Sequence, residues 1–239
     1  MSTNGNNTNG NDRDPRLLEG VLTSLPLFGQ VARAQVAMVA SRSRTVYARR
    51  GAVVCRRGER MPGVIALGYG ILKLALRRPG SEEKIVRFLG PNDIFGESAA
   101  MLGRPCPVDA IALEESMIVI VPAAPLIHLI EIDPKFARNL VFGLADRFLG
   151  LLSELEATVQ HSSLQRLASY VNSLATPGDV KDAMVVRLPA SKTAVAARLG
   201  MTKETMSRAL RELSNQRLIS VSGREILIVD RRRLAQVAG

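Results

Sequence analysis

Three polar side chains near the C-terminal end of the chain have the types and the spacing needed to read DNA bases. They are Glu204, Ser207 and Arg208 in the segment MTKETMSRAL, and side chains three or four residues apart share one face of an α-helix. The arginine can donate two parallel hydrogen bonds to guanine O6 and N7, and the glutamate can accept from an exocyclic amine. The short serine lets the helix approach a thymine edge. We therefore expect sequence-specific contacts with double-stranded DNA.

The residues around this face predict a helix-turn-helix, which would hold the second helix in the major groove. A first helix is expected from about Lys192 to Leu199, Gly200 supplies the turn, and Thr202 can cap the second helix. Residues 218–221 and 225–229 alternate in polarity around a Ser-Gly turn, which predicts a β-hairpin wing. The apolar residues of the two helices recur at helical spacing and should face inward: Val195, Leu199, Met206, Leu210 and Leu213.

The charge of the chain agrees with a polyanionic partner. The formal net charge is +10, and from His161 onward 13 Lys and Arg stand against 6 Asp and Glu. A basic C-terminal third attracts DNA and makes the affinity depend on salt. Phosphate contacts fix the register of a protein without reading sequence, and we expect them from Lys192, Thr193, Thr202, Lys203, Arg211 and Arg224.

No membrane partner is expected, because no apolar run approaches the ~18 residues of a spanning helix and no signal peptide or lipidation motif is recognised. The two cysteines, Cys55 and Cys106, do not make a disulfide framework. The chain is therefore expected in the cytoplasm with reduced thiols.

The N-terminal half predicts a β-structure. From Thr45 to Pro122, short runs of strand-forming residues alternate with glycines, which indicates an antiparallel β-roll of about eight strands. The fold class is α+β. The expected organisation is a disordered tail over 1–14, a β-roll sensor domain over 15–133, a dimerisation helix over 134–161 and a winged helix-turn-helix over 162–239.

The long helix carries an apolar seam. Its members are spaced three or four residues apart, which is typical of a helix that pairs with a partner helix, and a two-fold dimer suits a palindrome. The alternative is that this stripe packs only on its own β-roll. The seam residues are Leu140, Leu144, Phe148, Leu151 and Leu155.

The order of β-roll, long helix and winged helix-turn-helix resembles the Crp/Fnr superfamily of bacterial transcription regulators. The most specific segments are GPNDIFGESAAMLG at 90–103 and MTKETMSRAL at 201–210. Glu204, Ser207 and Arg208 match the E-x-x-S-R arrangement of the Fnr-like branch. The resemblance implies palindromes with TTGAT arms as the binding sites of the expected homodimer. RNA polymerase is expected as a further partner, and both an activator and a repressor stay open.

The resemblance also implies a small effector, which we expect in a pocket near Gly96, Glu97, Met101 and Leu102. Cyclic AMP is disfavoured, because the Arg-Ser pair of the cyclic AMP binders is replaced by RPCP at 104–107, where two prolines also remove backbone donors. An iron–sulfur cluster held by four cysteines within the chain is excluded by the two cysteines.

Haem is the remaining cofactor class, as in the nitric-oxide-responsive branch that lacks cluster cysteines. Its candidate ligands are Cys106, which begins a Cys-Pro dipeptide, His128, His161 and Cys55. Each of them also has an ordinary structural interpretation, as a buried thiol or a surface imidazole. Two alternatives stay open: an effectorless regulator controlled by its own abundance, and a regulator that responds to a cyclic nucleotide.

An enzyme is the rival class, since small β-rolls also hold catalytic metals. Such a site needs several histidines and a carboxylate inside the roll, and residues 45–122 contain no histidine. No enzymatic activity is expected. A nucleotide-binding regulatory subunit that does not touch DNA would leave the polar face of 202–211 unexplained.

Overall fold

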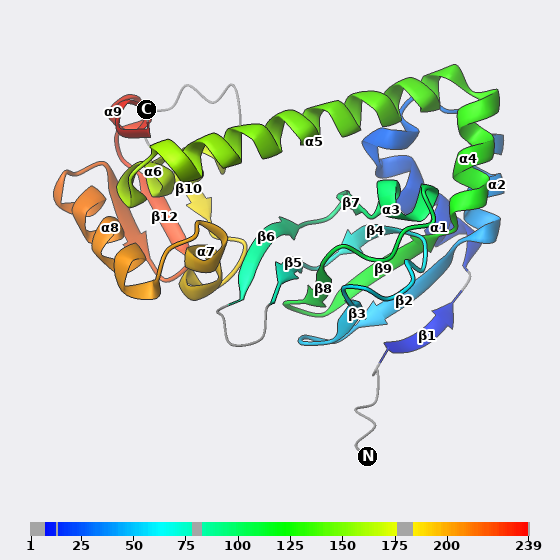
Figure 1. The fold of residues 1–239 in the computed structure, drawn as a ribbon, viewed down its shortest axis with the longest axis horizontal. Helices are drawn as coiled ribbons and strands as arrows, with labels where there is room; N and C mark the ends of the chain where they lie inside the picture. The colour runs from blue at the N-terminus through cyan, green and yellow to red at the C-terminus, as the bar shows by residue number, and fades with distance from the viewer. Residues whose placement is uncertain (1–7, 13, 78–82, 176–183, 239) are drawn as a thin grey trace, which may run out of the picture. The chain divides into compact units, whose positions relative to one another are not determined.

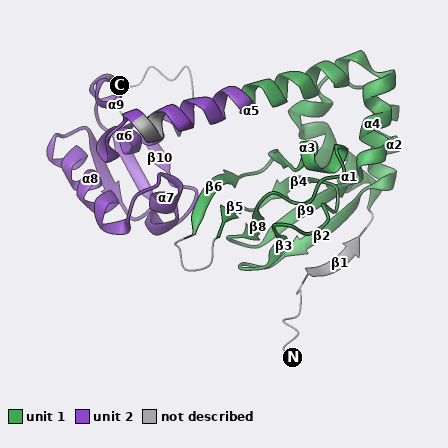
Figure 2. Cartoon of the chain, in the orientation of Figure 1, with its two compact units in different colours: residues 1–147 green, residues 148–239 purple. Residues whose placement is uncertain are grey.

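The computed structural model describes residues 8–12, 14–77, 83–175 and 184–238 (Figure 1). They form two compact units, residues 1–147 and 148–239 (Figure 2). The boundary lies inside the long helix α5 (Pro134–Gln160), so this helix is not a separate domain as the sequence predicted. Its first half belongs to the packing of unit 1 and its second half to unit 2.

Unit 1 is built on two antiparallel sheets. The first holds, in spatial order, β1 (Thr8–Asp12), β2 (Arg44–Ala48), β9 (Ser116–Val121), β4 (Val64–Tyr69) and β7 (Ile94–Phe95). The second holds β3 (Val53–Cys55), β8 (Asp109–Ala112), β5 (Leu72–Leu76) and β6 (Lys84–Leu89). The strands from β2 to β9 are the eight of the predicted roll. The predicted disorder of 1–14 is wrong for residues 8–12, whose backbone pairs with β2 as strand β1; residues 1–7 and 13 lie outside the described part.

The central strands of the first sheet are covered on both faces. All six residues of β9 are buried, and they alternate between two cores. Ile118 and Ile120 belong to the interior of the roll, whereas Val119 and Val121 belong to a core shared with the helices. Because successive side chains of a strand point to opposite faces, a continuous apolar run is needed there.

Helices close the outer face of this sheet. They are α1 (Pro15–Ser24), the 3-10 turn η1 (Pro26–Phe28), α2 (Arg33–Arg42), α4 (Ala123–Ile132) and the start of α5. Asp14 caps α1 by accepting from the Arg16 N–H at 2.9 Å, and the Asp133 carboxylate accepts from two N–H groups at the start of α5. Phe136 of α5 is fully buried and its ring centroid lies 5.4 Å from that of Phe28, which anchors α5 in unit 1.

Unit 2 combines helices with a three-stranded sheet. The helices are α6 (Ser163–Ser173), α7 (Lys192–Arg198), α8 (Lys203–Asn215) and α9 (Arg231–Ala238), and the sheet order is β10 (Met184–Arg187), β12 (Glu225–Ile228) and β11 (Ile219–Ser222). A capping box of Ser162 and Gln165 starts α6. Among the described residues, no helix has both the length and the apolar character needed to cross a membrane.

Candidate DNA-binding surface and the sensor unit

Helices α7 and α8 form a helix-turn-helix. The Ser191 hydroxyl accepts from the Ala194 N–H at 3.2 Å, and the Thr202 hydroxyl accepts from the Thr205 N–H at 3.2 Å, so both helices begin at a side-chain cap. Gly200 between them has φ +63°, a conformation that glycine adopts without strain. Val195, Met206, Leu210 and Leu213 are buried as predicted, and Leu199 is half-buried.

The three predicted base-reading residues lie together on the outer face of α8. Glu204, Ser207 and Arg208 are all exposed. The Glu204 backbone N–H lowers the pKa of its own carboxyl, and the Thr202 hydroxyl adds to this effect. The glutamate is therefore ionised and acts as a hydrogen-bond acceptor. The Arg208 Nη2 donates to the Thr205 hydroxyl at 3.3 Å, a single contact that leaves the other guanidinium donors for a base edge.

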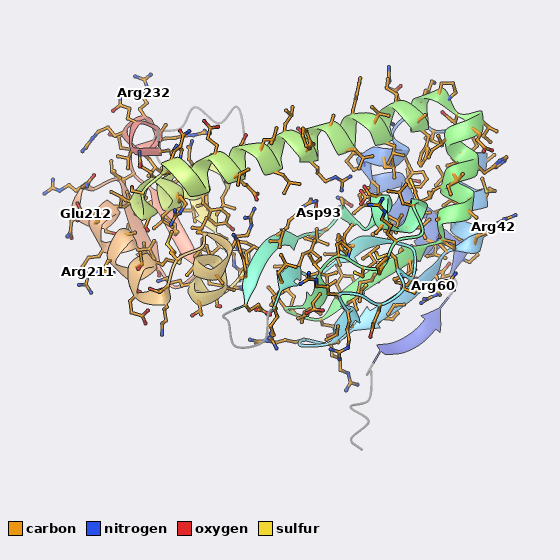
Figure 3. All side chains as sticks on the ribbon, viewed as in Figure 1. Arg42, Arg60, Asp93, Arg211, Glu212 and Arg232 are labelled. Atoms are coloured by element: carbon orange, nitrogen blue, oxygen red, sulfur yellow. The ribbon has the colours of Figure 1, made fainter. Side chains whose placement is uncertain are left out.

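The residues predicted to contact phosphates lie around this face and differ in how far their side chains are exposed. Thr193, Lys203 and Arg211 are exposed, while Lys192 and Arg224 are half-buried. Thr202 is exposed, but its hydroxyl is engaged in capping α8. Figure 3 shows Arg211 and Glu212 pointing outward from α8. Strands β11 and β12 form the predicted hairpin, with Gly223 at φ +59° in its turn, so Arg224 stands at the tip of the wing.

An ion pair inside unit 2 ties the helix-turn-helix to the long helix. Arg198 of α7 pairs with Glu154 of α5, and the Arg198 side chain is only 19% exposed. This contact was not predicted from the sequence, because the two residues are far apart in the chain. The pair joins the end of α5 to the first helix of the helix-turn-helix, and since the Glu154 side chain is 46% exposed its contribution to stability is small.

The apolar seam of α5 divides into two stripes. Leu140 is 7% exposed and Leu144 is half-buried, and both pack on the core of unit 1. Their assignment to a partner helix is therefore wrong. Phe148, Leu151 and Leu155 are 56–63% exposed. The sequence analysis missed four further exposed apolar residues of α5, which are Val141, Phe142, Leu149 and Leu152. Of these, Val141 and Leu152 continue the second stripe.

The second stripe has the heptad spacing of a helix pair. Val141, Phe148 and Leu155 are seven residues apart, and Leu152 follows Phe148 by four. The signal was present in the sequence, but the inward stripe through Leu140 and Leu144 runs beside it. Both stripes are apolar at helical spacing, so the pattern alone joined them into one seam.

The residues of the predicted effector pocket have differing surroundings. Gly96 is the N-cap of α3 (Glu97–Met101), Met101 packs on the helical core and Leu102 is 65% exposed. The Glu97 carboxylate is buried and forms an ion pair with Arg147 of α5. The Glu97 carboxylate is therefore already paired with a side chain of the protein.

Arg147 makes two hydrogen bonds in addition to its ion pair with Glu97. Its Nη1 donates to the Ile94 carbonyl at 3.1 Å and its Nε donates to the Gly143 carbonyl at 3.2 Å. One side chain thus joins α5 to β7 and to α3 at the last residue of unit 1. The sequence analysis missed Arg147, because its partners lie about fifty residues earlier in the chain.

A cavity of about 890 Å³ lies beside α3 instead. Arg60 and Arg104 line it together with Met61, Ala99 and Pro105, and none of the four predicted pocket residues does. Figure 3 shows where Arg60 lies on the roll. The interior of the roll itself is filled by apolar side chains, among them Ile65, Leu72 and Leu89.

Models of two protein families match the chain in the order of its two units. That of the cyclic nucleotide-binding domain matches residues 45–133, and that of the Crp-like helix-turn-helix domain matches residues 165–237. The chain is 26% identical over 193 residues to the transcriptional activator protein FnrA of Stutzerimonas stutzeri, covering 80% of this chain and 79% of FnrA. It is 24% identical over 223 residues to the CRP-like cAMP-activated global transcriptional regulator of Mycobacterium tuberculosis, covering 92% of this chain and 100% of that protein.

The chain belongs to the Crp/Fnr family. The structure of FixK2 from Bradyrhizobium japonicum has the same fold, with a TM-score of 0.73 and 23% identity over 82% of this chain and 98% of FixK2. The predicted α+β fold, with a β-roll, a long helix and a C-terminal helix-turn-helix, is confirmed. As a Crp/Fnr protein the chain is a DNA-binding transcription regulator.

The candidate haem ligands of this Crp/Fnr protein do not fit a haem. Cys106 is 1% exposed among apolar side chains of the roll, and its Sγ donates to the Val108 carbonyl at 3.1 Å. His128 is exposed on α4, with Nδ1 3.9 Å from Glu131. The His161 Nδ1 is buried without a hydrogen-bond partner in the described part of the chain, at the other end of α5. None of these side chains stands at the wall of the cavity beside α3.

The two cysteines meet inside the roll. The Cys55 thiol donates a hydrogen bond to Cys106, which raises the pKa of Cys55 and lowers the pKa of Cys106. Both thiols are buried. Cys106 is therefore the first of the two to ionise, with Cys55 as its hydrogen-bond donor.

Proposed function

We propose that this chain is a homodimeric transcription regulator that binds palindromes with TTGAT arms, one arm for each α8. The observation that carries the proposal is the exposed trio of Glu204, Ser207 and Arg208 at the start of a capped helix. Arg208 would bond guanine O6 and N7, and Glu204 would accept from an exocyclic amine. Lys203, Arg211 and the wing residue Arg224 would contact phosphates.

The dimer follows from the second stripe of α5. Val141, Phe148, Leu152 and Leu155 are large apolar side chains on an exposed helix face, and such a contiguous surface is typical of an interaction site. A second copy of the chain presents the same stripe, so the interface is self-complementary. Two copies then carry two recognition helices, which is what an inverted repeat requires.

For the sensor unit we propose a regulator that either responds to a small effector or needs none. The clasp by Arg147 supports a response, since a ligand that displaces Glu97 would free α5 at the point where it leaves unit 1. The filled interior of the roll supports an effectorless regulator controlled by its abundance. Haem with nitric oxide, which the sequence favoured, has no fitting ligand set, and cyclic AMP lacks its Arg-Ser pair.

The remaining parts of the proposal rest on the family assignment. A Crp/Fnr regulator of this kind would act in the cytoplasm, and RNA polymerase would be its partner in activation. No enzymatic step is proposed, because the curated relatives are transcription regulators.

The test is selection of bound sites from a random DNA pool with the full-length protein. The expected result is two inverted TTGAT arms with centres about one helical turn, ~34 Å, apart. Recovery of single arms would remove the dimer from the proposal. Recovery of arms without a guanine would remove the register given to Arg208.

A further inference from the structure

Three sulfur atoms gather at one end of the β-roll. Cys55 ends β3, Met61 lies in the turn before β4, and Cys106 precedes β8. The Cys55 Sγ lies 4.0 Å from the Met61 Sδ, and Cys106, in the same buried core of the roll, is the largest influence on the pKa of Cys55. Both cysteines of the chain are thus in one cluster, from segments that are far apart in the sequence.

The backbone holds these segments in register. The Gly58 N–H donates to the Cys106 carbonyl at 2.8 Å, and the Cys106 N–H donates to the Glu59 carbonyl at 2.8 Å. Strands β3 and β8 pair antiparallel, with Cys55 opposite Ala110. Cys55 is therefore held by strand pairing, and the segment around Cys106 is held by these two backbone hydrogen bonds.

Met61 packs closely against Gly96. A Cβ added to Gly96 would lie 2.0 Å from the Met61 Cε, and Gly96 has φ +89°. The end of the Met61 side chain therefore packs against the Gly96 backbone. Met61 is 8% exposed, and with Pro105 it lines the 890 Å³ cavity. Of the three sulfur-bearing residues only Met61 lines this cavity, and the two buried cysteines lie behind it.

Two thiolates and a thioether are soft ligands of the kind that select Cu(I). With metal–sulfur bonds of about 2.3 Å, three sulfurs around a trigonal metal stand about 4 Å apart, which is the separation of the Cys55 and Met61 sulfurs. Zinc prefers four ligands, and no group of three or more His, Cys, Asp or Glu suited to a metal occurs among the residues that the structure describes.

We propose that Cys55, Cys106 and Met61 bind one Cu(I) ion. Both thiol protons leave to solvent as the two Cu–S(thiolate) bonds form, and no electron is transferred. The bound site carries one net negative charge. Arg60 and Arg104, which line the same cavity, give it a positive surrounding. The proposal concerns a metal site of the roll and does not depend on which DNA the protein binds.

The experiment is a titration of the reduced full-length protein with Cu(I), without oxygen and against a competing chromogenic Cu(I) chelator. One Cu(I) per chain should be withdrawn from the chelator. X-ray absorption of the loaded protein should show a shell of three sulfurs at about 2.3 Å. A stoichiometry near zero, or a shell dominated by nitrogen and oxygen, would overturn the proposal.

Variants separate the site from adventitious binding. C55S and C106S should abolish the tight binding. Because a serine in the core can unfold the roll, Met61→Leu is the second variant: its volume is conserved, and it should weaken binding about tenfold while the sulfur shell falls to two. Met38→Leu, which changes a methionine of the helical core, is the matched control and should bind like the unchanged protein. Equal binding by the Cys55→Ser, Cys106→Ser double variant, or displacement of Cu(I) by equimolar Zn(II), would contradict the assignment.

Discussion

Replacing Arg147 with methionine should destabilise unit 1 by about 3 kcal/mol. The change leaves the Glu97 carboxylate, 5% exposed, without its cation, and removes the donors to the Ile94 and Gly143 carbonyls. Removing one partner of a buried ion pair costs about 3–5 kcal/mol. We take the lower end, because the Arg147 side chain is 29% exposed and water can reach the vacated space.

Calorimetry of the full-length protein measures this loss. For a unit of this size, 1 kcal/mol corresponds to a shift in Tm of about 2–4 °C, so the unit 1 transition should fall by about 6–12 °C. Peptide-resolved hydrogen exchange assigns the transition to unit 1. Arg138→Met is the matched control, since Arg138 is an exposed arginine on the same helix, and it should change the stability by less than about 0.5 kcal/mol.

A double variant tests the reasoning. Adding Glu97→Gln to Arg147→Met removes the unpaired charge, so the pair of changes should cost about 1 kcal/mol and recover most of the loss. A double variant as unstable as Arg147→Met alone would show that the charge pair is not what holds α5 to the roll. A fall in Tm of less than 2 °C for Arg147→Met would refute the claim that Arg147 holds α5 against the roll.

Three further changes have defined outcomes. Leu155→Glu places like charges face to face in the α5 pair, so this variant should sediment as a monomer. Leu102→Glu, on the exposed surface of unit 1, is the control and should sediment as a dimer. An unchanged dimer for Leu155→Glu would show that the second stripe is not the interface. Gly96→Ala should lower the free energy of unfolding by ~1–3 kcal/mol, chiefly through its φ of +89°. Gly90→Ala, with nothing within 4 Å, is the control, and equal stability of the two variants would contradict the argument from backbone strain. Glu204→Ala should bind DNA about as tightly as the unchanged protein but discriminate less between sites. Because the pKa of Glu204 is lowered, the unchanged protein should discriminate between sites equally well at pH 5 and pH 7. A loss of discrimination at pH 5 would mean that Glu204 does not accept from a base.

The sequence was sufficient where structure depends on near neighbours. The cap at Thr202, the turn at Gly200 and the wing turn at Gly223 all act within a few residues, so their pattern predicted α7, α8 and the hairpin, although the cap at Ser191 was not predicted. The eight strands of the roll were predicted for the same reason, because glycine turns separate short apolar runs. Helix α2 was missed, since small residues such as Ala34, Ala37 and Ala40 dilute its apolar pattern.

Contacts between segments that are distant in the sequence could not be predicted from these local patterns. The pair of Arg147 and Glu97, the meeting of Cys55 with Cys106 and the ion pair of Arg198 with Glu154 depend on strand register and helix packing. The partition of α5 into an inward and an outward stripe depends on where the helix lies against unit 1. For this reason Leu140 was assigned to a partner interface although it packs in the core of unit 1.

The most direct test of base reading by α8 is a double-mutant cycle between Arg208 and the guanine of the TTGAT arm. Binding of the full-length protein and of Arg208→Ala is measured at one salt concentration on the palindrome and on DNA with that guanine replaced in both arms. Arg232→Ala, an exposed arginine on α9 (Figure 3), controls for loss of charge. The variant Arg208→Ala should lose ~1–3 kcal/mol on the palindrome and almost nothing on the substituted DNA. Equal losses on both would show that Arg208 contacts phosphate and that the proposed reading of the operator is wrong.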